Sequence, residues 1–430
     1  MLSSITAYLC FSAGSSATAD NENQTNAYLY IRIGLNATPK SRAESGKPSP
    51  HEVLHRRDIQ DRESKKRMNE LLEKQPMAEA PLTVGRHTEL EKEGPAPVDE
   101  RVSVEAIAAV TYSKVERLEQ RVALLMVTVP LIGMVVGTAV LWGHGVGTLE
   151  IAMLAVMYCL TVAGIGVGYH RLYSHRSFEA HRTVRAVLAV MGSMAGQGPV
   201  LFWVALHRRH HKHSDRPGDP HSPHLNGSGL KGWIKGFWHS HVGWMLVPQA
   251  RNWWRNVPDL LRDPLLTRIN RSYFLWLGLG LLIPSVIEGV WTHSWMGALR
   301  GMLWGGLVRL FLVHHVTWSI NSICHLFGRR PFPSRDLSTN NVWLSLLSFG
   351  EAWHNNHHAF PNSAKHGLDW WQIDVNAIII TTLKKLGLAW NVKIPAATLI
   401  AEKRSAQKLA LAGAMSGGDS GAHSDGGDLS

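Results

Sequence analysis

Histidine is the residue type whose number and spacing in this sequence point most directly to chemistry. The chain has 24 histidines, and several of them recur in short groups. Residues three or four positions apart share one face of a helix, so such a group can aim its side chains at one place. The groups are His170 with His175; His207 with His210 and His211; Asn321 with His325; and His354 with His357 and His358.

These groups predict a metal site built from nitrogen ligands. Their nine imidazoles are too many for one ion but enough for two. Neutral imidazole binds iron, zinc, copper and nickel, so the ligand type alone does not choose the metal. No carboxylate recurs within the groups, which disfavours a carboxylate-bridged site in a helix bundle. The three cysteines form no CxxC pair, so a thiolate site is disfavoured as well.

Nine further histidines carry no ligand spacing. We interpret them as isolated polar side chains near a membrane surface, because an isolated histidine has no neighbouring ligand in the sequence. They are His213, His221, His224, His239, His241, His293, His314, His315 and His366.

Four long apolar runs predict the elements that carry the histidine groups. Each is about the ~20 residues that a helix needs to cross a bilayer, so we expect an all-α integral membrane protein. The fourth run contains Arg300 and Arg309, which must face protein or water. A further run, 186–206, is interrupted at 196–199 and is interpreted as helical but not spanning. The four expected spans are residues 122–142, 149–169, 273–291 and 296–316.

Loop charges predict how the spans are oriented. The links 143–148 and 292–295 contain no Lys or Arg, whereas 171–271 is rich in both. Lys and Arg concentrate in cytoplasmic loops, so both termini and the long middle loop are expected in the cytoplasm. The formal net charge of +11 could also suggest nucleic-acid binding. The apolar spans and the lack of a known nucleic-acid-reading motif argue against it.

The two ends of the chain differ in composition from its middle. Residues 1–105 are rich in Ser, Asn, Glu, Lys and Pro, and we expect a disordered extension. Its first 19 residues faintly resemble a signal peptide but lack the basic n-region. The expected catalytic domain is 106–398, and 399–430 is expected to be a flexible tail.

The histidine groups resemble the three histidine boxes of membrane fatty acid desaturases of the acyl-CoA delta-9, or stearoyl-CoA, type. The similarity covers roughly residues 115–395 and includes the order and spacing of the boxes and their place relative to the spans. Two stretches outside the boxes match as well, namely Thr317–Ser322 leading to His325, and Gly350 with Glu351.

The resemblance implies four membrane helices beneath a cytoplasmic helical cap that holds two iron ions. One iron is then held by His170, His175, His207, His211 and His357. The other is held by His210, His325, His354 and His358, with a water held by Asn321.

The resemblance also implies a narrow bent tunnel for the acyl chain, lined by Gln197, Trp203, Thr317 and Trp318. Arg208 inside the second box is retained and is expected to contact the substrate head group. An Arg-Asp pair found in vertebrate members is replaced here by Ala205 and Leu206. Acyl-CoA remains the first expectation despite this departure, because a basic cytoplasmic surface suits the phosphates of CoA. Acyl groups on carrier protein or phospholipid are the alternatives.

The expected reaction is O2-dependent desaturation of a long acyl chain to a cis-monounsaturated product. Breaking an unactivated C–H bond needs a redox metal, because no side chain is a strong enough oxidant. The sequence shows no flavin, nicotinamide or haem motif, so a ferredoxin, or a small b-type cytochrome with its reductase, is the expected electron donor. The alternatives are a related di-iron hydroxylase acting on lipid, alkane or sterol, and a non-enzymatic metal carrier. The carrier is disfavoured because its histidines should follow a path through the spans.

Overall fold

The computed structural model describes residues 100–247 and 252–416 of the chain. Most of the expected N-terminal extension therefore lies outside the described residues, but its last residues do not. The first described helix, α4, begins at Glu100, before the predicted start of the domain, and continues through the first apolar run to His144.

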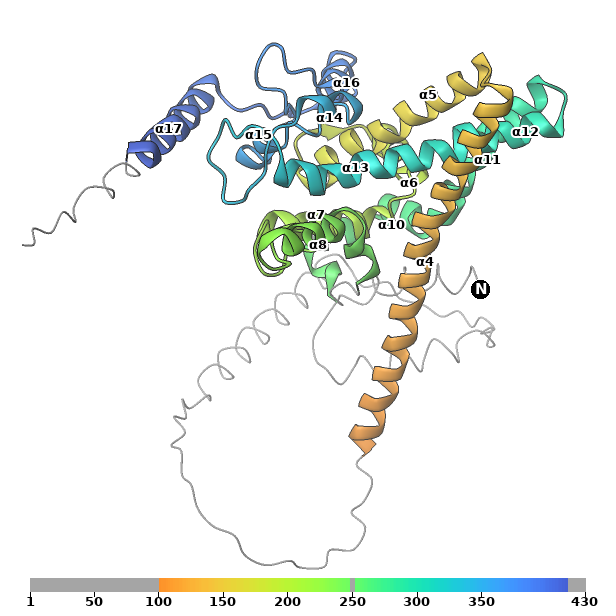
Figure 1. The fold of residues 1–430 in the computed structure, drawn as a ribbon, viewed down its shortest axis with the longest axis horizontal. Coiled ribbons are helices and arrows are strands. Elements are labelled where there is room, and N and C mark those ends of the chain that lie inside the picture. Colours follow the sequence, from red (N-terminus) through yellow and green to blue (C-terminus); the bar gives the residue numbers. More distant parts are fainter. Residues whose placement is uncertain (1–99, 248–251, 417–430) are drawn as a thin grey trace, which may run out of the picture. The chain divides into compact units, whose positions relative to one another are not determined.

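The regular structure of the described chain is helical apart from two short strands (Figure 1). Two segments, η1 and η4, are wound as π-helices, and η2 and η3 are short 3-10 helices. The elements are α4 (Glu100–His144), α5 (Thr148–Ala163), η1 (Gly164–Ser174), β1 (Glu179–Ala180), α6 (Arg182–Met194), α7 (Val200–His213), α8 (Gly229–His241), η2 (Gly243–Leu246), η3 (Trp253–Asn256), α9 (Pro258–Leu261), α10 (Pro264–Arg271), α11 (Tyr273–Trp291), α12 (Trp295–Gly301), η4 (Met302–Val308), α13 (Arg309–Leu326), α14 (Val342–Leu347), α15 (His354–Ala359), α16 (Val375–Lys385), β2 (Ala389–Trp390) and α17 (Ala397–Ser416).

Four helical stretches of the described chain are long and apolar enough to cross a membrane, which confirms the predicted number. Their bounds are Arg117–Val140, Thr148–Ser174, Tyr273–Trp291 and Trp295–Leu326. The second and fourth extend beyond the predicted ends, because each continues without a break into a segment that carries histidines. Large apolar side chains such as Ile132 and Val135 are 60% and 62% exposed, as expected for a surface that lipid covers.

The two arginines of the fourth span have polar partners within the protein. Arg309 is fully buried and donates to the carbonyl oxygens of Met194, Gly280 and Gly305. Arg300 lies 3.3 Å from the carboxylate of Glu150. The expectation that this span faces protein on one side is confirmed. Arg309 also joins the fourth span to the end of α6, which fixes the start of the interrupted region.

The interrupted run forms two helices rather than a span. α6 ends at Met194 and α7 begins at Val200, and Gly196 and Gly198 between them have φ of 71° and 102°. Glycine takes these angles easily because it has no Cβ. The break therefore turns the chain so that α7 starts a new direction. Its second half carries the second histidine box.

The largest buried core packs η1, α6 and α7 together. Gly164 in η1 lies so close to the backbone of Gly192 in α6 that a Cβ would overlap it. β1 and β2 pair antiparallel, with Glu179 opposite Trp390 and Ala180 opposite Ala389, and so join the segment after η1 to the chain after α16.

The prediction of a flexible tail from residue 399 is wrong for its first part. Residues Ala397–Ser416 form helix α17. Lys403 donates to the carbonyl oxygen of Ala359, and Arg404 pairs with Asp369 at 3.0 Å. The predicted tail included residues such as Ala, Leu, Lys and Gln that favour helix, while only the later stretch is rich in Gly and Ser.

Candidate metal centre

The first histidine pair is positioned by the π-helix η1. His170 lies within it, and the backbone N–H of His175 donates to the carbonyl oxygen of His170 at 3.1 Å. Such an i→i+5 bond places residues five apart above one another, which an α-helix does not do. The two imidazole rings consequently lie 4.9 Å apart. The H-x4-H spacing thus works because the second span ends in π-helical winding.

The other boxes use ordinary helical spacing. His207, His210 and His211 share one face of α7, and His354, His357 and His358 share one face of the short helix α15. His325 lies near the end of α13. Segments far apart in the sequence therefore meet at one place.

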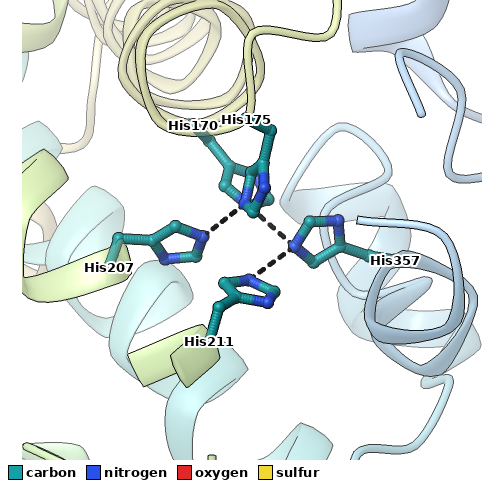
Figure 2. Close-up of side chains that lie close together, drawn as sticks. All are labelled: His170, His175, His207, His211 and His357. Atoms are coloured by element: carbon teal, nitrogen blue, oxygen red, sulfur yellow. Dashed lines mark hydrogen bonds between the residues drawn. The ribbon is translucent and has the colours of Figure 1, made fainter. Parts of the chain in front are cut away.

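Five of the imidazoles form a first group, drawn in Figure 2. The Nε2 atom of His357 lies 3.1 Å from that of His170 and 2.9 Å from that of His211. The Nε2 atoms of His175 and His207 lie 2.8 Å apart. All five rings point their edges toward a common space between η1, α7 and α15 (Figure 2).

Four imidazoles form a second group from α7, α13 and α15, namely those of His210, His325, His354 and His358. The Nε2 atom of His354 lies 3.1 Å from the Nε2 atoms of both His325 and His358. In each group one ligand nitrogen per residue lies within 4.8 Å of all the others. The structure thus brings together the nine predicted histidines, and it divides them as the resemblance implies.

Carboxylates contact the far side of four of these rings. Nδ1 of His210 lies 3.0 Å from Asp219, Nδ1 of His325 lies 2.8 Å from Asp215, and Nδ1 of His358 lies 2.6 Å from Asp336. His170 is bonded in the same way to Glu351. A carboxylate only accepts, so Nδ1 carries the proton and Nε2 presents a lone pair to the inside. Carboxylate-bonded imidazoles of this kind are characteristic of metal-ligating histidines.

These polar contacts control the charge of the site. Burial, together with the neighbouring imidazoles, holds the pKa of His175, His207, His211, His354 and His357 well below the usual range. These rings are therefore neutral, which is the form that binds a metal. Burial also disfavours a charge on His210, but the carboxylates around it, Asp219 first, outweigh that effect and raise its pKa.

The carboxylates themselves stay ionised. Burial opposes the negative charge of Glu351, yet Arg171 and His170 outweigh it and hold its pKa below the usual range. Burial likewise opposes the charge of Asp219, and His210 outweighs it, so the pKa of this carboxyl is also lowered. Negative charge therefore surrounds the imidazoles on their outer side.

The inner nitrogen atoms fit a bound metal ion. Lone pairs that face one another at 2.8–3.1 Å repel unless a proton or cation lies between them. Two nitrogens about 2.1 Å from one ion lie about 3.0 Å apart at a right angle and about 3.4 Å apart at the tetrahedral angle. The observed spacing is closer to that of two ligands at a right angle than to that of tetrahedral ligands.

The sequence interpretation missed several residues of this centre. It placed no role on Asp215, Asp219 or Asp336, which are far from the boxes or follow them in a polar loop. Three of the histidines interpreted as surface groups are buried, namely His221, His314 and His366. His366 and Glu351 both lie beside His170, and His221 lies beside Asp219 and His210. The interpretation is wrong for these three. Among these residues, only Glu351 was noted in the sequence, as part of the Gly350–Glu351 match to the desaturase family.

A buried ion-pair network fixes the first group. Arg171 is fully buried and contacts Glu351 at 2.8 Å and Asp374 at 2.9 Å. Asp374 also accepts from the backbone N–H groups of His366 and Gly367. Arg171 thus connects the first histidine box to Asp374 after the third box, and it holds Glu351 in place against His170.

An apolar cavity of about 210 Å³ reaches this centre. The four residues expected to line an acyl tunnel, Gln197, Trp203, Thr317 and Trp318, all line it, as does Asn321. The Gln197 amide donates to the Thr317 hydroxyl at 2.7 Å, and Trp203 stacks on His207. A smaller adjoining cavity shares Trp203, His207, Thr317 and Asn321 with it and is lined also by His170, His210 and His354.

Arg208, expected to contact a head group, is engaged within the protein. Its guanidinium donates to both carboxylate oxygens of Asp259 and to the carbonyl oxygens of Tyr173, Ser174 and Asn256. A guanidinium has five N–H donors, and all five are used. In this arrangement Arg208 joins the first and second boxes to the loop before α9, and its contact with a head group stays a prediction.

Fold and site together define a class: a helical protein with four candidate membrane spans and a multi-histidine centre beside an apolar cavity. The family model for fatty acid desaturases matches residues 146–392. This chain belongs to the fatty acid desaturase family, and it is an oxidoreductase acting on fatty acyl chains.

Named relatives show the range of substrates in this family. The chain is 47% identical to a hex-5-enoyl-[acyl-carrier protein] acetylenase of Moorena producens, over 68% of this chain and 92% of that protein. It is 38% identical to an sn-1 stearoyl-lipid 9-desaturase of Anabaena variabilis, over 57% of this chain and 84% of that protein. It is also 38% identical to an icosanoyl-CoA 5-desaturase of Limnanthes douglasii, over 57% of this chain and 65% of that protein.

Proposed function

We propose that this chain places a cis double bond in a long fatty acyl chain, using O2 and two iron ions. The observation that carries the proposal is the convergence of nine imidazole nitrogens, in two groups, beside an apolar cavity. His170, His175, His207, His211 and His357 hold one iron. His210, His325, His354 and His358 hold the other, with Asn321 acting through a water.

Iron bound by these residues supplies the redox chemistry with O2 that breaking an unactivated C–H bond requires. The protein's own contribution is position. Gln197, Thr317, Trp203 and Trp318 surround the acyl chain and decide which carbon lies beside the metals. The carboxylates Glu351, Asp215, Asp219 and Asp336 keep the ligand imidazoles in the tautomer that presents Nε2 inward.

The head group and the double-bond position are further parts of the proposal. Mid-chain, delta-9 desaturation is proposed because the box residues match that type. Acyl-CoA, the first expectation, loses support from Arg208, whose donors are all engaged. Relatives named for carrier protein, lipid and CoA substrates make all three head groups part of the proposal to be tested.

A second candidate is an acetylenase, which would turn an alkene into an alkyne at the same site. The 47% identity to an acetylenase over 92% of its length favours it. Saturated and monounsaturated substrates, supplied separately, distinguish the two reactions by mass spectrometry of the products. An alkyne from the unsaturated substrate alone would favour the acetylenase.

His354→Ala tests the proposal, because His354 contacts two ligands of the second group. We expect the variant, in a host lacking its own desaturase, to form no unsaturated product, and the purified protein to hold less iron. His181→Ala, at an exposed position before α6, is the control and should behave as the wild type. Unchanged unsaturated lipid in the His354 variant, measured by gas chromatography, would refute the ligand assignment.

A further inference from the structure

A second opening reaches the candidate metal centre from another side. It is a hollow of about 560 Å³, here called the basin, lined by His175, His211 and His358. These are one residue from each histidine box. Arg335 and Lys403 also line it, and Lys403 lies on α17. In Figure 1, α17 and α15 lie at the same end of α13.

The basin and the acyl cavities contact different histidines. The cavities are lined by His170, His207, His210 and His354, and the basin shares no described lining residue with either of them. The two sides also differ in chemistry. The larger acyl cavity is mostly apolar, whereas polar and charged side chains surround the basin. The centre therefore has a lipid side and a polar side.

The basin is positively charged at its rim. Arg335 is exposed, and among the described residues its guanidinium has no hydrogen-bond or ion-pair partner. Arg208 and Lys403 add positive charge to the lining, although Arg208 is paired with Asp259. The single carboxylate among the described residues that line the basin, Asp336, is engaged by His358 and Ser338. Asp336 therefore does not pair with Arg335, and the positive charge of Arg335 can contact a partner protein.

We infer that the basin is the docking site of the electron donor, an acidic one-electron carrier protein. The inference rests on the proposed function. Desaturation removes two hydrogens from the acyl chain and reduces one O2 to two waters. The acyl chain supplies two of the four electrons together with its two hydrogens. The donor protein supplies the other two electrons, one at a time, and water supplies two protons. A donor seated on the basin contacts ligand residues of both groups while the acyl chain occupies the other side.

Arg335→Glu reverses the charge at the rim of the basin and leaves the proposed metal-binding histidines unchanged. The probes are two reduced proteins, an acidic plant-type ferredoxin and the soluble haem domain of cytochrome b5, mixed with the iron-loaded full chain in nanodiscs. We expect at least a tenfold slower second-order oxidation of the better probe at low salt, because opposite charges speed association. The dependence of this rate on salt should weaken as well. Lys403→Gln, which removes a second positive charge from the lining, should show a smaller loss.

Dithionite separates this inference from the proposed function. With dithionite, O2 and a saturated substrate, Arg335→Glu should form product at the wild-type rate in a single turnover. Lys231→Glu on α8 is the matched charge control and should leave the donor rate unchanged. Three outcomes would overturn the docking site. They are an equal loss of donor oxidation rate in the Lys231 variant, no loss of that rate in the Arg335 variant, and a wild type that accepts electrons from neither probe. A wild type that forms no product even with dithionite would overturn the proposed function instead.

Discussion

Carboxylates contact the outer nitrogen of four of the imidazoles that we propose as ligands. Nδ1 of His210, His325 and His358 each faces an Asp, and His170 faces Glu351. Each contact fixes both the tautomer and the ring orientation. The absence of carboxylates from the boxes therefore does not mean that carboxylates are absent from the site. They contact Nδ1 of the imidazoles, whereas Nε2 is the atom that faces the proposed metal ions.

Asp219→Asn should weaken iron binding without unfolding the protein. The amide keeps one oxygen that can accept a hydrogen bond, but without the negative charge it stabilises the proton on Nδ1 of His210 less. Loss of such a partner costs about 10- to 100-fold in metal affinity. Competition with a calibrated iron chelator measures this. Asp369→Asn, which removes a surface pair with Arg404, is the control, and a variant that binds iron like it would contradict the assigned role.

At the scale of elements, π-helical winding decides how the first box works. η1 continues α5 directly, and three glycines of η1 lie against α6 and α16. A Cβ on Gly166 would overlap the Asn376 amide and would lie 3.0 Å from Glu351. Close packing at this seam thus supports the network that orients His170.

Gly166→Ala should disturb the centre through packing. Overpacking in a filled core costs about 1–3 kcal/mol, so we expect a lower unfolding temperature in detergent and less iron per protein. Gly278→Ala is the matched control, because this glycine is also helical but a Cβ added to it would meet nothing within 4 Å. If both variants unfold at the same temperature and bind the same amount of iron, the close contact between η1 and α16 does not support the site.

At the scale of the whole molecule, the spans must place the centre at one membrane face. Loop charges predict that the short turns of both hairpins lie outside and that the histidine boxes lie in the cytoplasm. Trp291 and Trp295 flank the second turn and are 73% and 71% exposed, as is typical of side chains at a membrane–water interface.

His293→Cys tests this orientation, because His293 lies in the turn between α11 and α12. In a variant whose three native cysteines are replaced, a membrane-impermeant maleimide added to intact cells should label this position. A cysteine in place of Lys231 on α8 should react only after the membrane is permeabilised. The reverse labelling pattern would show the opposite orientation.

Sequence alone determined the four spans, the grouping of the histidines and the family, because these depend on local apolar length and on residue spacing. It did not determine the π-helical winding of η1, which brings the rings of His170 and His175 together. The carboxylate partners also came only from the fold: Asp215 and Asp336 lie far from His325 and His358 or within polar loops, and tertiary contacts bring them to Nδ1.

The tail and Arg208 show the same limit. The helical residues of α17 were grouped with a Gly-rich end, and the contacts with Ala359 and Asp369 that hold this helix link residues distant in sequence. Arg208 has the charge to bind a phosphate, but only the tertiary structure shows its donors occupied. Spacing thus identified which side chains could bind a metal. Long-range packing decided which atoms they present, because proton position and ring orientation depend on neighbours that are remote in the chain.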